Sequence, residues 1–186
     1  MTMVVWGDRL GNGSTPPAGI LLAQAYTFLD TCYNYDYPDG NIYTPSDSIY
    51  PVYGSTGCPT TNQWVQYALT YNGVEEILYI DGSESGIPSP ASGDIYAFQL
   101  SIGEVINTYT FNGLIANAQV YNVSLSQPEI QALYQEGIGG APIDPNHIVG
   151  WWPLNGNAQD YSGNGNDGTA TNVQYTSTWT NGYMQP

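Results

Sequence analysis

Residues 64–82, WVQYALTYNGVEEILYIDG, carry the strongest structural pattern in the chain. Between residues 64 and 71, Val, Tyr, Leu and Tyr occupy every second position, and this period of two is typical of a strand with one buried face. Asn72-Gly73 is a dipeptide that favours a tight turn, and the apolar residues 77–80 return as a second strand. The segment therefore predicts a β-hairpin.

Shorter apolar patterns on both sides of the hairpin predict further strands. We expect them at residues 3–6, 20–29, 95–102, 105–111, 113–121, 148–154 and 173–179, with one or two short strands inside the polar segment 30–62. The composition agrees, because 17 Tyr and 5 Trp favour strands and 22 Gly with 13 Pro provide turns. The sequence thus predicts one all-β domain.

One short helix interrupts this pattern at residues 126–136. Ser126 and Glu129 have the spacing of a capping box, in which each residue satisfies a free backbone group of the first turn. Ile130 and Leu133 then form an apolar face, and Gly137 ends the helix.

The charge balance limits the partners that the chain can have. Sixteen acidic residues stand against a single cation, Arg9, so that the formal net charge is −15 at pH 7. Nucleic acids and anionic membrane surfaces repel such a protein, and no apolar run is long enough to span a bilayer. A chain with so few cations suits an acidic environment. The alternative is that the chain simply has the acidic composition that is ordinary for an extracellular protein.

The two cysteines indicate an oxidising compartment. Cys32 and Cys58 are expected to form a disulfide, which would close a loop of about 27 residues and stabilise the fold by roughly 3–4 kcal/mol. The alternative is a pair of buried free thiols. Asn12 and Asn122 stand in glycosylation sequons, which agrees with an extracellular or cell-surface location.

Three blocks of the sequence resemble laminin-G-like jelly rolls of the concanavalin A-like class. NQWVQYALTYNGVEEILYIDG resembles the central hairpin of that family, FNGLIANAQVYNVSLSQPEIQALYQEG its closing strand and helix, and WWPLNGNAQDYSGNGNDGT its opening strand and loop. The likeness is strongest to tandem-repeat surface proteins of archaea, in which an EGIGGAPI linker joins the copies. The resemblance implies an antiparallel jelly-roll β-sandwich with one short helix.

The order of these blocks differs from that of the family, because the opening block comes last. We therefore expect a jelly roll lacking its opening strand at residues 1–137, a Gly/Pro linker at 138–147 and opening strands at 148–186. These strands could complete the same sheet beside residues 113–121, be donated to a neighbour in a filament, or begin a second copy. Some surface must cover their large apolar side chains, which are those of Trp151, Trp152 and Leu154.

The loop that comes after the opening strand is a candidate calcium site. In the family a calcium ion near this loop is common, and the resemblance carries Asp160 over most directly. Oxygen ligands are also available from Asn164, Asn166 and Asp167. A polar loop satisfied by turns and water is the alternative. The acidic residue that the family often has in its closing strand is replaced by Ala116 or Asn117.

A cluster of tyrosines is the best candidate binding surface. Its members are Tyr33, Tyr35, Tyr37, Tyr43, Tyr50 and Tyr53. Aromatic faces stack on sugar rings, although the same residues could instead pack over the edge of the sandwich. His147 is the one histidine, too few for a His-based triad or zinc site. We expect a non-catalytic extracellular module for adhesion or glycan binding, with a structural subunit of a filament, fibre or surface layer as the alternative.

Overall fold

The computed structural model describes residues 1–10, 27–32, 37–44, 51–95, 99–105 and 109–176. Its main sheet is antiparallel throughout. The strand order is β12 (Ile148–Trp152), β11 (Gly113–Tyr121), β1 (Thr2–Arg9), β5 (Trp64–Tyr71), β6 (Glu75–Ile80) and β7 (Ser83–Glu84), and β8 (Ser89–Pro90) also pairs with β6. The hairpin predicted from residues 64–82 is formed by β5 and β6.

Two smaller sheets accompany the main one. The first, which we call the small sheet, contains β2 (Phe28–Asp30), β3 (Asp39–Asn41) and β4 (Val52–Tyr53). The second pairs β9 (Glu104–Val105) with β10 (Tyr109–Thr110). Together with the single short helix, these antiparallel sheets confirm the predicted all-β sandwich.

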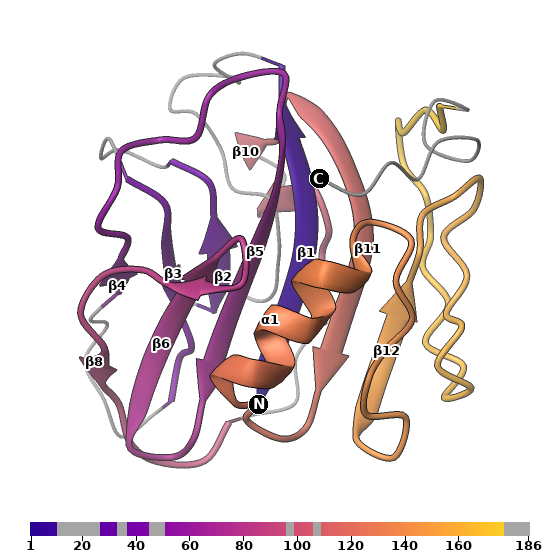
Figure 1. Ribbon diagram of the computed structural model, residues 1–186. Coiled ribbons are helices and arrows are strands. Elements are labelled where there is room, and N and C mark those ends of the chain that lie inside the picture. The colour runs from indigo at the N-terminus through magenta and orange to yellow at the C-terminus, as the bar shows by residue number, and fades with distance from the viewer. Residues whose placement is uncertain (11–26, 33–36, 45–50, 96–98, 106–108, 177–186) are drawn as a thin grey trace.

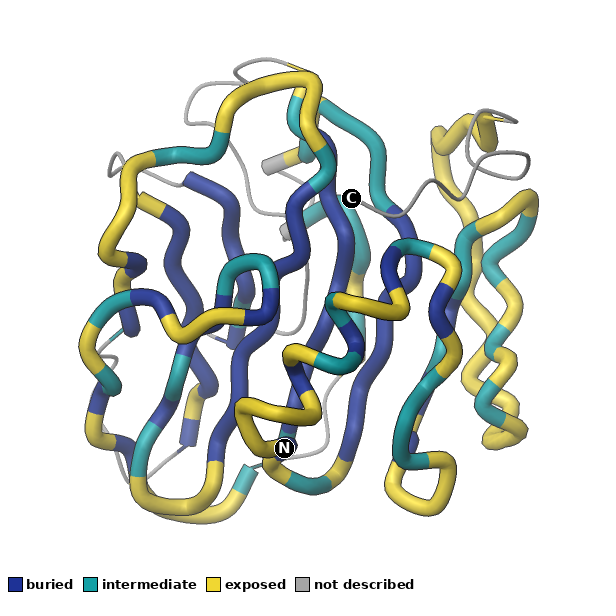
Figure 2. The backbone as a smooth tube through the Cα atoms, viewed as in Figure 1, coloured by how far each residue is buried: buried dark blue, intermediate teal, exposed yellow. Residues whose placement is uncertain are grey.

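The main sheet is covered on both faces, and each face has its own core. On one face, Met3, Tyr67 and Leu69 pack against Leu29 and Val52 of the small sheet. On the other face, Val4 and Ala68 pack against the apolar side of α1 (Gln127–Glu136), which crosses the sheet in Figure 1. Figure 2 shows the result, in which the central strands are buried and the outer side of α1 is exposed.

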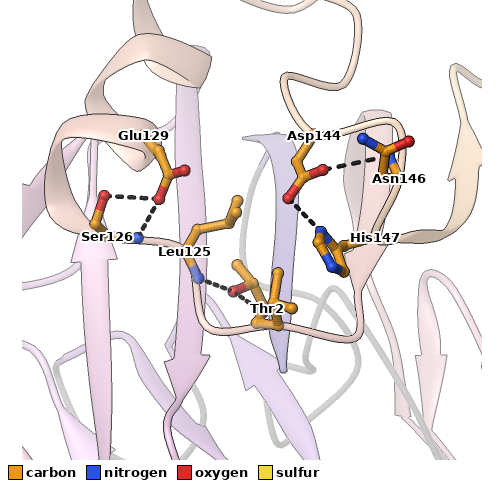
Figure 3. A network of polar contacts seen from close by, with 8 residues as sticks. Thr2, Leu125, Ser126, Glu129, Asp144, Asn146 and His147 are labelled. Carbon is orange, nitrogen blue, oxygen red and sulfur yellow. Dashed lines mark hydrogen bonds and ion pairs between the residues drawn. The ribbon is translucent and has the colours of Figure 1, made fainter.

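The helix begins where the sequence predicted. The carboxylate of Glu129 accepts hydrogen bonds from the backbone nitrogen of Ser126 at 2.7 Å and from its hydroxyl at 2.6 Å (Figure 3). Just before it, the hydroxyl of Thr2 accepts a hydrogen bond from the backbone nitrogen of Leu125 at 2.8 Å and ties β1 to the helix. At ten residues, α1 is too short to cross a membrane, and no described helix could do so.

The strand β12 lies at the edge of the main sheet, where it pairs with β11 of the same chain. Trp152 is 6% exposed and packs in the core shared with the small sheet, with Leu154 partly buried beside it. Trp151 packs against the core on the helix side, and its Nε1 donates a hydrogen bond to Oδ1 of Asn117 at 2.8 Å. In this structure the sandwich itself therefore buries Trp152 and partly buries Trp151 and Leu154.

The segment between α1 and β12 is held against the main sheet. The carbonyl of Gly140 accepts hydrogen bonds from the side chains of Asn117 at 2.9 Å and Gln119 at 3.4 Å, both buried on β11. Near its end, His147 Nδ1 lies 2.7 Å from Oδ2 of Asp144 (Figure 3). These contacts set the path by which the chain returns to the sheet.

Three of the expected strands are wrong. The described strand residues within 105–111 belong to two short strands, β9 and β10, which pair with each other in place of one strand. Within residues 95–102, the described positions form no strand apart from a single bridge at Ile102. Ile95, Leu100 and Ile102 pack against the core instead, so their apolar character reflects burial without strand pairing. In the segment 173–179, residues 173–176 form no strand and are exposed, and the remaining three residues lie outside the described part.

Candidate functional site

The outer face of the small sheet gathers polar and aromatic side chains. Side chains alternate between the two faces of a strand, and Leu29 on β2 and Val52 on β4 face the core. Their neighbours Asp30 and Tyr53 therefore face away from the main sheet. The register pairs Asp30 with Asp39 and Asp39 with Tyr53, so one row of side chains crosses all three strands on this face.

A second line of side chains runs along β3 itself. Gly40 faces the core, since a Cβ atom on it would lie 3.0 Å from a core leucine side chain, so Asn41 shares the outer face with Asp39. Tyr37 and Tyr43 continue this spacing of two beyond the ends of β3, and they are 44% and 38% exposed. Two exposed tyrosines thus flank a carboxyl group and an amide.

Asp30 and Asp39 are buried although they face away from the main sheet, with exposed fractions of 5% and 3%. Burial raises the pKa of Asp30 to about 7, partly offset by hydrogen bonds from the backbone of Cys32 and Thr31. Burial, and then the negative charge of Asp30, raise the pKa of Asp39 to about 8. Among the described residues, Oδ1 of Asp39 has no hydrogen-bond partner.

The disulfide fixes this end of the molecule. Cys32 and Cys58 are bonded, which confirms the expected pairing. The bond ties the end of β2 to the segment after β4, so it joins the two outer strands of the small sheet. The backbone nitrogen of Cys32 also donates to Oδ1 of Asp30 at 2.9 Å.

The predicted tyrosine cluster is only partly visible. Tyr37, Tyr43 and Tyr53 lie on or beside the outer face of the small sheet, whereas Tyr33, Tyr35 and Tyr50 lie outside the described residues. The sequence did not single out Asp30. Asp30 is the last residue of β2 and Asp39 is the first residue of β3. The sequence shows both acids, but it does not show that the two strands pair in the register that places them opposite each other.

The predicted calcium loop makes a dense set of hydrogen bonds with β12. Oδ1 of Asp160 accepts hydrogen bonds from the backbone nitrogens of Trp151 and Ser162, each at 2.9 Å. Its Oδ2 accepts from the hydroxyl of Ser162 and the backbone nitrogen of Asn166, also at 2.9 Å. Partial burial favours the neutral acid, but these hydrogen bonds outweigh it and lower the pKa of Asp160.

The other predicted ligands of that loop also bond to protein atoms. Asn164 donates from its side chain to the carbonyl of Ile148 at 2.8 Å, and Asn166 to that of Val149 at 2.8 Å. Oδ1 of Asp167 accepts the backbone nitrogen of Asp160 at 2.9 Å. The loop thereby covers the open edge of β12, which would otherwise offer free carbonyls to another strand.

Calcium binding at this loop stays a prediction. In the ranges that the structure describes, no group of three or more His, Cys, Asp or Glu side chains is placed to hold a metal ion. Of the predicted glycosylation sites, Asn122 is exposed just after β11, and Asn12 lies outside the described residues.

Comparison with known proteins identifies the fold family. A sequence profile described as the concanavalin A-like lectin/glucanases superfamily matches residues 13–131, more than half of the chain. This chain belongs to that superfamily. A search of curated protein sequences gives no match.

Solved structures of this superfamily fold resemble the chain at low sequence identity. A proposed carbohydrate-binding protein from Bacteroides ovatus aligns with a TM-score of 0.66 and 16% identity, over 88% of this chain and 49% of that one. Domain 4 of an extracellular GH43 arabinanase from Geobacillus stearothermophilus, solved with arabinotriose, aligns with a TM-score of 0.55 and 15% identity. This alignment covers 72% of this chain and 66% of that domain's chain. A pentraxin from Limulus polyphemus aligns with a TM-score of 0.54 and 14% identity, over 73% of this chain and 70% of the pentraxin chain. The chain thus spans about half of the first protein, and these likenesses show the fold alone.

Proposed function

We propose that this superfamily member is a non-catalytic glycan-binding module that acts outside the cell. The observation that carries the proposal is the line of alternate side chains Tyr37, Asp39, Asn41 and Tyr43 along β3, beside Tyr53 on β4. The disulfide supports the location, because such bonds persist in oxidising compartments. Two solved neighbours whose names or bound ligand concern carbohydrate support the ligand class.

The tyrosine rings provide the contact surface in this proposal. Tyrosine offers a large, rigid ring and a hydroxyl at little cost in side-chain entropy, which suits the mixed apolar and hydroxyl surface of a sugar. Tyr37, Tyr43 and Tyr53 are each about 40% exposed, so a substantial part of each residue is accessible to a ligand. The carboxyl and amide groups between them are too deeply buried to make most of the contact.

A glycan array probed with the labelled chain tests this function, with arabinotriose included because one solved neighbour was crystallised with it. The affinity for any glycan that binds is then measured by calorimetry for the double variant Tyr37→Ala/Tyr53→Ala. Loss of two contact residues should weaken binding by at least about tenfold. Tyr161→Ala is the matched control, since Tyr161 is 49% exposed in the loop beside β12. Equal affinities of the double variant and the wild type would contradict the proposed surface.

A second function, assembly between copies, is supported by the position of β12. Among the described strands it pairs only with β11, and it comes after the linker at residues 138–147. A strand attached in this way can occupy the same edge of a neighbouring copy and so build a fibre or filament. We infer that exchange requires release of Gly140 from Asn117 and Gln119.

Light scattering over a wide range of protein concentration tests assembly. Exchange predicts chains or rings that grow with concentration and that an added peptide of residues 148–176 shortens by capping free edges. The variant Asn117→Ala, which frees Gly140, should increase the fraction of oligomers. A monomer at every concentration, for both the wild type and this variant, would rule out strand exchange.

A further inference from the structure

The buried acids of the small sheet remain unexplained by glycan contact. Asp30 and Asp39 are directly opposite one another on antiparallel strands. At such positions Cβ atoms lie about 4.5–5.5 Å apart, and two like charges there destabilise a sheet. Burial adds to the cost, because a buried charge needs a partner of opposite sign.

The chain's own cations do not supply that partner. It has one Arg, no Lys and one His. Arg9 donates to the carbonyl of Pro59 at 3.2 Å, and the amino-terminal ammonium donates to the carbonyl of Tyr71 at 2.7 Å. His147 pairs with Asp144 near the start of β12. The acidic pair must therefore be neutralised by something other than a protein side chain.

We propose that Asp30 and Asp39 together bind one calcium ion on the outer face of the small sheet. When both are ionised, their combined charge of −2 balances the +2 charge of one divalent cation. Oδ1 of Asp39, in a side chain only 3% exposed, has no partner among the described residues and so has free lone pairs for a cation. Calcium suits a buried site better than magnesium, which gives up its water reluctantly. The two carboxylates supply part of its six to eight oxygen ligands, and neutral oxygens supply the rest.

Protons compete with calcium for this pair. Without a cation, burial and mutual repulsion hold the pKa values of Asp30 and Asp39 at about 7 and about 8, so the acids are neutral in mildly acidic solution. The other titratable or charged groups of the packed strands are Tyr53 on β4, Glu75, Glu76 and Tyr79 on β6, Tyr67 and Tyr71 on β5, and Arg9, Asp8 and Asp81 around Tyr67. None of these adds a cation to the pair itself, so calcium binding should strengthen as the pH rises.

Calorimetric titration of calcium into the full chain, freed of metal with EDTA and with no glycan present, tests this site. At about pH 9 we expect one calcium per chain, and at about pH 6 an apparent affinity weaker by at least about tenfold, because two protons must leave. Near neutral pH, the heat should depend on the ionisation enthalpy of the buffer, since binding releases protons. This experiment is independent of the glycan proposal, so either proposal can fail without the other.

Variants assign the calcium to its ligands. Asp39→Asn and Asp30→Asn keep the size of the side chain and remove its charge, and each should abolish binding while circular dichroism shows a folded chain. Asp94→Asn, at an exposed carboxylate outside both acidic sites, is the control and should keep the affinity of the wild type. The proposal is wrong if the full chain takes up no calcium at about pH 9, or if Asp160→Asn abolishes binding while Asp39→Asn does not.

Discussion

Replacing Trp152 by Ala should show how much of the stability depends on the return of β12 to the sheet. Trp152 is 6% exposed in the core shared with the small sheet, and its Nε1 donates to the carbonyl of Asn166 at 2.9 Å. Its ring fills the space beside Gly150, where an added Cβ would lie 2.1 Å from the ring. Truncating a buried Trp costs about 3–5 kcal/mol, and we expect about 4 kcal/mol here.

Urea denaturation followed by circular dichroism measures this loss without relying on tryptophan fluorescence. With a slope of about 2 kcal/mol per molar urea, the midpoint should fall by about 2 M. Val149→Ala is the control on the same strand, because Val149 is 38% exposed and its truncation should cost less than about 1 kcal/mol. If Trp152→Ala costs no more than Val149→Ala, the strand does not contribute to the core in the way described.

Three further outcomes are expected. Reducing the disulfide between Cys32 and Cys58 should lower stability by roughly 3–4 kcal/mol and weaken glycan binding, which denaturation and calorimetry with and without reductant will show. Asp160→Ala should cost about 1–3 kcal/mol, because four donors lose their acceptor, and the difference from the wild type should shrink below about pH 4, as the lowered pKa of Asp160 requires. In calcium-free buffer, Asp30 and Asp39 have the opposite effect on the pH dependence of stability. Because their pKa values are raised, the folded chain keeps protons that the unfolded chain loses. Their contribution to the free energy of unfolding is therefore full below about pH 4 and is lost as the pH rises through about 7 to 8. Chemical denaturation at several pH values should show a smaller decline for Asp39→Asn, and an equal decline would contradict the burial of this pair.

The elements with complete local patterns could be predicted from the sequence. The hairpin of β5 and β6 has period-two strands around an Asn-Gly turn, and α1 begins at the capping box of Ser126 and Glu129. In both cases neighbouring residues contain the whole pattern. The apolar residues near 95–102 led to a wrong strand prediction. A loop that packs against a core and a buried strand can have the same apolar composition, so composition alone does not separate them.

The candidate site depended on information that no single segment contains. The tyrosines could be predicted as a cluster from composition, but their shared face results from the inward orientation of Gly40 and Val52. The opposition of Asp30 and Asp39 results from the register of two three-residue strands, which are too short to show a period. Asp160 was expected to be free for a metal, yet its hydrogen bonds to the edge strand are formed only after β12 pairs with β11.

Nuclear magnetic resonance titration of the isotopically labelled chain with a glycan selected on the array would locate the binding surface. We expect the backbone amides of Tyr37, residues 39–43, Val52 and Tyr53 to shift as the glycan is added, while those of α1 and β12 stay in place. The side-chain resonances of Tyr37 and Tyr53 should move with the same affinity. Shifts confined to α1, β12 or the loop at Asp160 would place the glycan elsewhere and contradict binding at the outer face of the small sheet.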